Sequence, residues 1–272
     1  MNSHPTTGPD QRQLKKLAVF KFASCDGCQL SLLACEDELL HLAGQVEIAY
    51  FLEASSRFDE GPWDIALVEG SITTHEDEER IQRIRRNSGL VVTIGACATA
   101  GGIQSLKNWA DHKDFLKCVY AQPEFISTLA TSTAIAEHIP VDYELRGCPI
   151  NRFQLLEILT SLIGGQTPRI PRHSVCLDCK RRGTVCVEIA QGIPCLGPVT
   201  HSGCGALCPA YDRGCYGCFG PAAQPNCDSL SVTLTDHGTS TERLVTLFRN
   251  FNAAAVEFQQ QSDALVELEM PS

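Results

Sequence analysis

Cysteines are the side chains of this sequence whose number and spacing could do chemistry. The 272 residues contain 15 of them, nine between residues 176 and 227 and six before residue 176. The first residues show neither an apolar signal-peptide core nor a twin-arginine pair, so we expect a cytoplasmic protein. Disulfides do not persist in a reducing cytosol, and a dense, patterned set of cysteines there predicts metal binding.

Four of the scattered cysteines follow short β-rich runs of the sequence. They are Cys25 and Cys28 after residues 17–22, Cys97 after residues 90–95, and Cys148 after residues 141–145. Ligands of open parallel sheets collect outside the carboxyl ends of the strands. We therefore expect this first thiol set to converge on one point and to bind a [4Fe-4S] cluster. The Cys25-x-x-Cys28 pair taken alone would also suit thioredoxin-like chemistry or zinc.

Eight of the remaining cysteines divide into two groups of four. The second thiol set is Cys176, Cys179, Cys186 and Cys195, and the third thiol set is Cys204, Cys208, Cys215 and Cys218. Each group has the thiolates for one further cluster. Two structural zinc sites are the alternative, because zinc ribbons use the same Cys-x-x-Cys pairs. We expect unliganded thiols at Cys35, which falls on the apolar face of a predicted helix, and at Cys118 and Cys227.

Alternating strands and helices are expected to position the first thiol set. The β-rich runs are residues 17–22, 46–51, 64–70, 90–95 and 141–145, and the helix-compatible segments are about 28–43, 75–87, 98–112, 123–138 and 151–163. This rhythm predicts an α/β fold, a flavodoxin-like open parallel sheet with helices on both faces. Glycine and proline within residues 163–173 predict a domain boundary.

The second half of the chain lacks the apolar periodicity of an ordinary core. Residues 174–227 therefore predict a small irregular domain that metal sites organise. After it, Thr239 and Glu242 have capping-box spacing and predict a C-terminal helix. The predicted organisation is a disordered N-terminus (1–14), a flavodoxin-like domain with one cluster (15–165), a cysteine-rich domain with two clusters (166–230), and a C-terminal helix and tail (231–272).

Charge and missing motifs exclude several classes of function. With 22 Lys and Arg against 32 Asp and Glu, the formal net charge is −10, which leaves no basic surplus for nucleic acid. The sequence has no run of about 18 apolar residues, so no membrane span is predicted. It contains neither dinucleotide-binding nor P-loop glycine spacing, so we expect no bound nucleotide.

The cysteines and their neighbours together resemble the small subunit of [NiFe] hydrogenases. The motifs are SCDGCQ at 24–29, VEGSI at 68–72, IGACA at 94–98 and RGCP at 146–149, followed by the cysteine-rich segment. In that segment, CLDCK, PCLGPVTHSGCGALCP and GCYGCFGP are most similar to the delta subunit of cytoplasmic, NAD(P)-linked sulfhydrogenase-type enzymes.

This resemblance implies an oxidoreductase subunit that transfers electrons but does not itself carry out the H2 chemistry. The nickel–iron site would lie in a separate large (alpha) subunit, and the electrons would pass to flavin/NAD(P)-binding and iron–sulfur subunits. The relay would consist of three [4Fe-4S] clusters: a proximal one on the first thiol set, a distal one on the second and a medial one on the third.

The sequence departs from the periplasmic members of that family at three points. It lacks their export signal, Cys176 stands where they have a histidine ligand, and Cys208 adds a fourth medial thiol. His173, three residues before Cys176, is a rival distal ligand. Glu69 matches an acidic position of the family, where a carboxylate would tune the cluster, relay a proton or cap loop amides; we assign it no catalytic role.

Two other functions stay open on the sequence alone. A relay subunit of a complex-I-like quinone reductase would share the N-terminal fold, but that family has adjacent cysteines in place of Cys25-x-x-Cys28 and lacks the eight-cysteine segment. A zinc-bound scaffold would give a colourless preparation. The terminal acceptor, whether NAD⁺, NADP⁺, polysulfide or a ferredoxin, is a property of other subunits.

Overall fold

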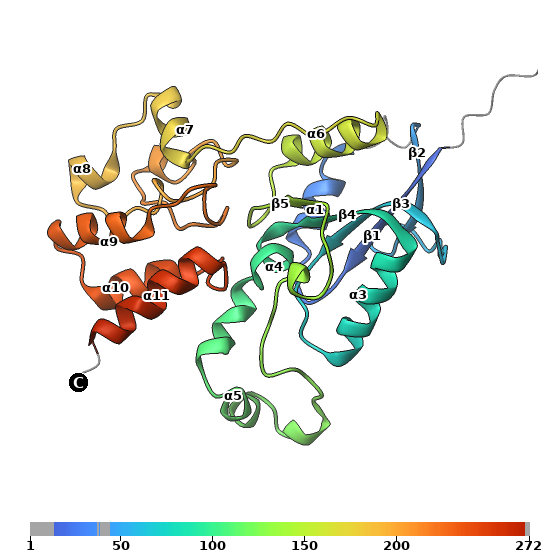
Figure 1. Ribbon diagram of the computed structural model, residues 1–272, viewed down its shortest axis with the longest axis horizontal. Helices are drawn as coiled ribbons and strands as arrows, with labels where there is room; N and C mark the ends of the chain where they lie inside the picture. The colour runs from blue at the N-terminus through green and yellow to red at the C-terminus, as the bar shows by residue number, and fades with distance from the viewer. Residues whose placement is uncertain (1–13, 37, 39–43, 270–272) are drawn as a thin grey trace, which may run out of the picture.

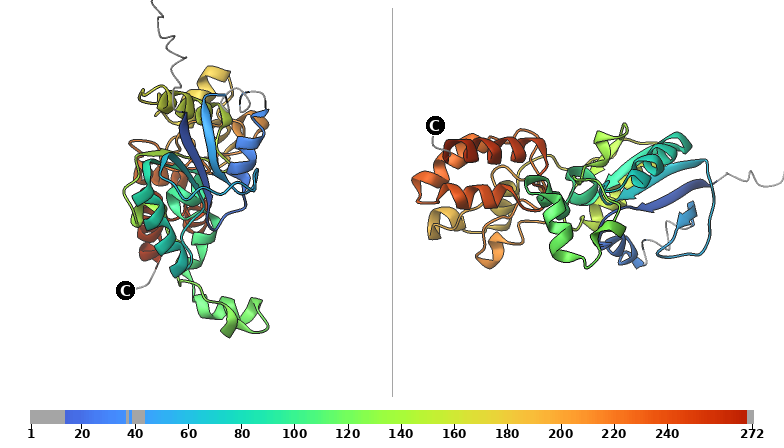
Figure 2. Two further views of the ribbon diagram at one scale, coloured as in Figure 1. Left: turned by 90° about the vertical axis from the view of Figure 1, so that its right-hand side faces the viewer. Right: turned by 90° about the horizontal axis from the view of Figure 1, so that it is seen from below.

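A computed structural model describes residues 14–36, 38 and 44–269. The N-terminal segment for which we expect disorder lies, apart from Leu14, outside the described residues. A parallel sheet with its helices forms one end of the molecule, and the cysteine-rich segment with the C-terminal helices forms the other (Figures 1 and 2).

The sheet has the predicted parallel arrangement. Its strands are β1 (Lys15–Lys21), β2 (Val46–Phe51), β3 (Trp63–Glu69), β4 (Ser88–Ile94) and β5 (Tyr143–Leu145). They lie in the order β2-β1-β3-β4-β5, and every neighbouring pair is parallel. This is the flavodoxin-like order, as predicted. The central strand β3 is buried along almost its whole length, as expected for a strand covered on both faces.

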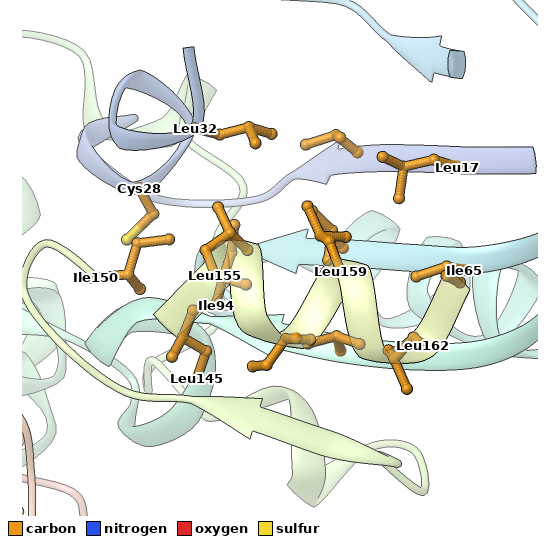
Figure 3. Packing of buried hydrophobic residues seen from close by; sticks show 14 of the residues in the cluster. Leu17, Cys28, Leu32, Ile65, Ile94, Leu145, Ile150, Leu155, Leu159 and Leu162 are labelled. Carbon is orange, nitrogen blue, oxygen red and sulfur yellow. The ribbon is translucent and has the colours of Figure 1, made fainter. Parts of the chain in front are cut away.

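Helices cover both faces of the sheet. On one face, α1 (Gly27–Leu33) and α6 (Arg152–Ile163) contribute Leu32, Leu155 and Leu159 to a core with the strands (Figure 3). On the other face, α3 (His75–Asn87) packs with Ile81 and Ile84. The predicted helices over 75–87 and 151–163 are confirmed. Part of the one predicted over 28–43 lies outside the described residues.

Two other predicted helices are wrong in extent. The segment 98–112 includes only the end of α4 (Gly95–Ala100), followed by the 3₁₀ helix η1 (Ile103–Trp109), because Gly101 and Gly102 both have positive φ and end the first helix.

The segment 123–138 has only the short 3₁₀ helices η2 (Pro123–Phe125) and η3 (Ile135–Glu137). Backbone hydrogen bonds from Leu129 to Thr73 and between Thr133 and Ile72 hold it extended. The helix in this region is instead α5 (His112–Val119).

The cysteine-rich segment is short of regular structure, as predicted. It contains α7 (Val175–Arg182), α8 (Val187–Gln191) and the 3₁₀ helix η4 (Pro209–Tyr211). Its own buried cluster consists of Val175, Val187, Cys195, Ala206 and Cys215. Two of these five residues are cysteines, so the thiols themselves form part of the small core.

The C-terminal helix that we predicted from Thr239 onward is broken into two helices, α10 (Thr241–Phe248) and α11 (Val256–Glu269). A helix that we did not predict, α9 (Cys227–Asp236), precedes them. The side chain that caps α10 belongs to Ser240, which accepts the Arg243 N–H, and not to Thr239. Between α10 and α11 the chain turns, and Asn252 donates its side-chain N–H to the Gly217 carbonyl. The turn between α10 and α11 is thus fixed by a hydrogen bond to a residue that is distant in the sequence.

These three helices supply apolar surface that the cysteine-rich segment lacks. Phe248 and Phe258 pack edge to face at 5.5 Å between ring centroids, in a cluster that includes Leu196 and Val199 of the cysteine-rich segment. The hydrophobic stabilisation of this end of the molecule therefore comes mainly from outside the region of the thiols.

We predict that Asn151 contributes to stability through two separate contacts. Its side-chain oxygen accepts the N–H groups of Phe153 and Gln154 at the start of α6, and its amide donates to the Gly203 carbonyl at 2.6 Å. Asn151→Ala should lower the free energy of unfolding by about 2 kcal/mol, since a cap and a hydrogen bond are each worth about 1.

The measurement is urea unfolding of the complete protein followed by circular dichroism. Asn151→Ser is the matched control, because serine keeps a capping oxygen but cannot reach Gly203, and it should lose about half as much. An Asn151→Ala variant as stable as the unchanged protein would show that neither contact contributes to stability.

Candidate metal centres

The sheet brings the first thiol set to the carboxyl ends of β1, β4 and β5. Cys25 follows β1 and is exposed, Cys28 is buried in α1, Cys97 lies in α4 and Cys148 follows β5. Burial raises the pKa of Cys97 to about 11, and the nearby thiols of Cys148 and Cys25 add to the rise. Burial also raises the pKa of Cys28, with further contributions from Glu69, Cys97 and Cys148. The four thiols are thus close enough to repel one another if ionised.

Glycines allow the backbone to approach these sulfurs closely. At Gly95, where φ is +86°, an added Cβ would overlap the Cys28 Sγ. At Gly102, where φ is +68°, it would stand 2.6 Å from the Cys97 Sγ. Both positions require glycine for their backbone conformation and for the space beside a sulfur atom. The main chain therefore lies close around the sulfur atoms of the first thiol set.

Glu69 holds part of this main chain in place. The side chain is 2% exposed at the end of β3. Its carboxylate accepts the backbone N–H of Cys28 at 3.0 Å, that of Gln29 at 3.3 Å and the Gln29 side-chain amide at 2.8 Å. Of the roles considered from the sequence, these hydrogen bonds correspond to amide capping, but the capped backbone amides lie in the first turn of α1 and not in a loop. The carboxylate fixes the backbone that carries Cys28.

The second thiol set surrounds a cavity of about 130 Å³ between α7, α8 and the loop at Cys195. Burial raises the pKa of Cys176 to about 11, and the thiols of Cys195, Cys179 and Cys186 raise it further. A Cβ on Gly197 would lie 3.3 Å from the Cys195 Sγ and 3.4 Å from the Cys176 Sγ. Cys195 also accepts backbone N–H groups from Gly197 and Cys215.

His173 lies outside this cavity. Its Nε2 stands 3.0 Å from Asp178 Oδ1, and Cys176 is among the residues that line the cavity. Cys176 and not His173 thus lies beside the other three thiols of the second set.

The third thiol set lines a second cavity, of about 390 Å³, and Cys148 of the first set lines the same cavity. Burial, followed by the nearby thiols of Cys204, Cys208 and Cys148, raises the pKa of Cys218 to about 12. The third set also contacts the second, because the backbone N–H of Cys215 donates to the Cys195 Sγ at 3.1 Å. The third set thus lies between the first and the second, and the three sets follow one another in series.

The three remaining cysteines lie outside these sets. Cys35 is fully buried and its Sγ donates to the Ser31 carbonyl, which agrees with the core position predicted for it. Cys227 is buried at the start of α9, and Cys118 is exposed in α5.

The chemistry of the donors fits an iron–sulfur cluster at each set. All twelve ligand atoms would be thiolate sulfur, which suits soft metal centres, zinc and iron–sulfur clusters among them. Buried thiols with raised pKa values ionise side by side only when a positive centre compensates them. Among the residues that the structure describes, no three His, Cys, Asp or Glu side chains are gathered so that they could hold a single metal ion.

None of the described helices has the length and apolarity to cross a membrane.

Comparison with known proteins gives consistent matches. The family described as NADH ubiquinone oxidoreductase, 20 Kd subunit, matches residues 25–162. Sulfhydrogenase 2 subunit delta of Pyrococcus furiosus is 35% identical over 221 residues, which cover 81% of this chain and 92% of that protein. An F420-non-reducing hydrogenase subunit of Methanocaldococcus jannaschii is 33% identical, with 75% of this chain and 81% of that protein covered.

Among solved structures, the chain is similar to one from an NAD⁺-reducing [NiFe]-hydrogenase in the H2-reduced state. The TM-score is 0.55 at 29% identity, and the match covers 58% of this chain and 96% of that chain. Nearly all of that chain is therefore matched by little more than half of this one. The remaining part of this chain has almost no counterpart there.

We predict that removing the Glu69 carboxylate destabilises the fold around Cys28. Glu69→Ala leaves three N–H groups without their acceptor, and each buried unsatisfied donor costs about 1–3 kcal/mol. Urea unfolding should show a loss of about 3 kcal/mol or more. Glu69→Gln keeps one acceptor oxygen and should lose less.

Glu144→Ala is the matched control for this experiment. Glu144 is exposed, and its carboxylate contacts Arg146 at the surface, so its removal should change stability little. Equal stability of the Glu69→Ala and Glu144→Ala variants would show that Glu69 does not stabilise the start of α1.

Proposed function

This chain belongs to the family of the NADH ubiquinone oxidoreductase 20 Kd subunit, and we propose that within it the chain is the electron-transfer subunit of a heteromeric [NiFe] hydrogenase. The observation that carries this proposal is the series of three thiol sets, in which neighbouring sets share a cavity or a hydrogen bond. Such a series suits the passage of single electrons across the subunit.

We infer that each set holds one [4Fe-4S] cluster, proximal on the first, medial on the third and distal on the second. Bound clusters would supply one-electron redox chemistry. The protein would set their potentials through thiolate ligation, burial and N–H donors to sulfur, such as the two amides on Cys195.

Support differs between the sets. The family match ends at residue 162 and so includes only the first set. The sulfhydrogenase delta subunit matches 81% of this chain, which is too much to be confined to the residues before the cysteine-rich segment. Support for the medial and distal assignments therefore comes from that relative and from the geometry of the thiols.

We propose that the chain assembles with a large subunit bearing the nickel–iron site and with flavin/NAD(P)-binding and iron–sulfur subunits. Exposed Cys25 places the first set near the surface. The segment containing α5 projects from the body of the molecule and exposes Phe115, Val119 and Phe125 (Figure 2). Apolar side chains grouped on a projection are typical of protein interfaces. A reducing compartment such as the cytoplasm would keep the thiols available for metal.

The quinone-reductase alternative is not favoured. The relatives matched over most of this chain are hydrogenase subunits, and their similarity extends beyond the segment that matches the family as a whole.

Metal content tests this proposal. Anaerobically purified protein should be brown and contain about 12 Fe per chain, from three four-iron clusters. Elemental analysis and visible absorption provide the measurement. Stoichiometric zinc with little iron in a colourless preparation would overturn the proposal in favour of the scaffold.

A second prediction concerns Cys208, the fourth thiol of the third set. Cys208→Ala should convert the medial cluster from [4Fe-4S] to [3Fe-4S], because one iron loses its thiolate and is held only by sulfides. Its potential should rise, since potential depends on cluster type and charge. Oxidised protein should show a new three-iron EPR signal.

Cys118→Ala is the control, because Cys118 is exposed and outside the three sets. Its iron content and EPR spectrum should match those of the unchanged protein. If Cys208→Ala likewise keeps full iron and an unchanged spectrum, Cys208 is not a ligand and the medial assignment is wrong.

A further inference from the structure

Two segments that carry cysteines of different thiol sets lie against each other. One contains Cys195 of the second set, and the other contains Cys215 of the third set; both side chains are buried. The Cys215 N–H donates to the Cys195 Sγ at 3.1 Å, and the Leu196 N–H donates to the Cys215 carbonyl at 3.1 Å. The backbone of one prospective ligand thus bonds directly to the sulfur of another.

Gly214 is the residue that permits this close approach. A Cβ at this position would overlap the Pro194 carbonyl oxygen and stand 3.0 Å from the Pro194 carbonyl carbon. The φ of Gly214 is not in the left-handed region, so an alanine could adopt its backbone conformation. The requirement for glycine is therefore one of space between the two segments, not of local conformation.

The hydrogen bond has two physical consequences for the sites that it joins. It gives a short path from the Cys215 Sγ through Cβ, Cα and N–H to the Cys195 Sγ. It also places a positive N–H dipole on the Cys195 sulfur, which favours the form with more negative charge. A donor from Gly197 at 3.4 Å acts on the same sulfur but comes from within the second set.

We propose that Gly214 is a positioning residue that keeps the segments of Cys195 and Cys215 in contact and so maintains electronic coupling between the second and third thiol sets. We call this contact between Cys195 and Cys215 the junction. This inference rests on the proposed function. One electron crosses the junction at a time, with one site oxidised and the other reduced; no covalent bond forms or breaks and no proton is transferred. Because Gly214 is not a ligand, each set keeps its four thiols whether or not the two segments stay in contact.

The experiment uses Gly214→Ala in the complete enzyme complex. We expect iron content to match that of the unchanged protein. Stepwise reduction monitored by EPR should show loss of the spin–spin splitting between the medial and distal clusters and a negative shift in the distal midpoint potential. Full iron with unchanged splitting and potentials would overturn the proposal.

Gly197→Ala is the matched variant. Its Cβ would stand 3.3 Å from the Cys195 Sγ and 3.4 Å from the Cys176 Sγ, but 3.8 Å from the Cys215 Cβ, which is ordinary van der Waals contact. We therefore expect the hydrogen bond between Cys215 and Cys195 to persist. It should shift the distal potential and keep the splitting. A loss of splitting in both variants would mean that any disturbance of Cys195 has this effect, and would overturn a specific role for Gly214.

The outcome for Gly214 is separable from that for the proposed function. Iron-free or zinc-loaded unchanged protein would refute the function, whereas unchanged coupling in iron-loaded Gly214→Ala would refute only the junction. If the Gly214→Ala variant does not assemble, EPR of the unchanged protein provides the test. Its reduced medial and distal clusters should show spin–spin splitting, and the absence of that splitting would overturn the junction.

Discussion

The close grouping of partly buried thiols is the constraint on which the rest of this structure depends. Burial raises the pKa of Cys28, Cys176 and Cys215, and nearby thiols raise these values further. Such groups ionise together only beside a positive centre. The fold must therefore provide space for that centre, amide donors for the sulfurs and a scaffold that keeps like charges close.

The two ends of the molecule meet this constraint in different ways. At the first thiol set, a fully formed sheet fixes the strand ends, and Glu69 holds the backbone of Cys28. At the other two sets, the local core is small and contains Cys195 and Cys215 themselves. Helices α9, α10 and α11 add apolar surface there, but metal binding and folding are expected to be coupled at this end far more than in the sheet.

The family match divides the chain between the first thiol set and the other two. It covers residues 25–162, in which most of the sheet and the first thiol set lie. The residues beyond 162 contain the second and third sets. A hydrogen bond joins these two sets, and the third set shares a cavity with Cys148 of the first.

The sequence alone predicted the strands and an open parallel sheet, together with the expectation that the first thiol set meets at one edge of it. The strands follow from hydrophobic patterns within a few residues, the parallel sheet from their alternation with helices, and the expected meeting of the thiols from the rule that ligands collect at the carboxyl ends of parallel strands. The burial of Cys35 also followed from helical periodicity, which places it on the apolar face with Leu32.

Tertiary structure decided what depends on contacts between residues far apart in the chain. The part of 123–138 between its two 3₁₀ helices bonds through its backbone to Ile72 and Thr73 and forms no helix, and the C-terminal helix breaks where Asn252 reaches Gly217. Local propensity carries no information on such partners. For the same reason the sequence left amide capping as one of three possible roles for Glu69 and did not show the lack of space at Gly214, because the partner of each residue lies on a distant segment.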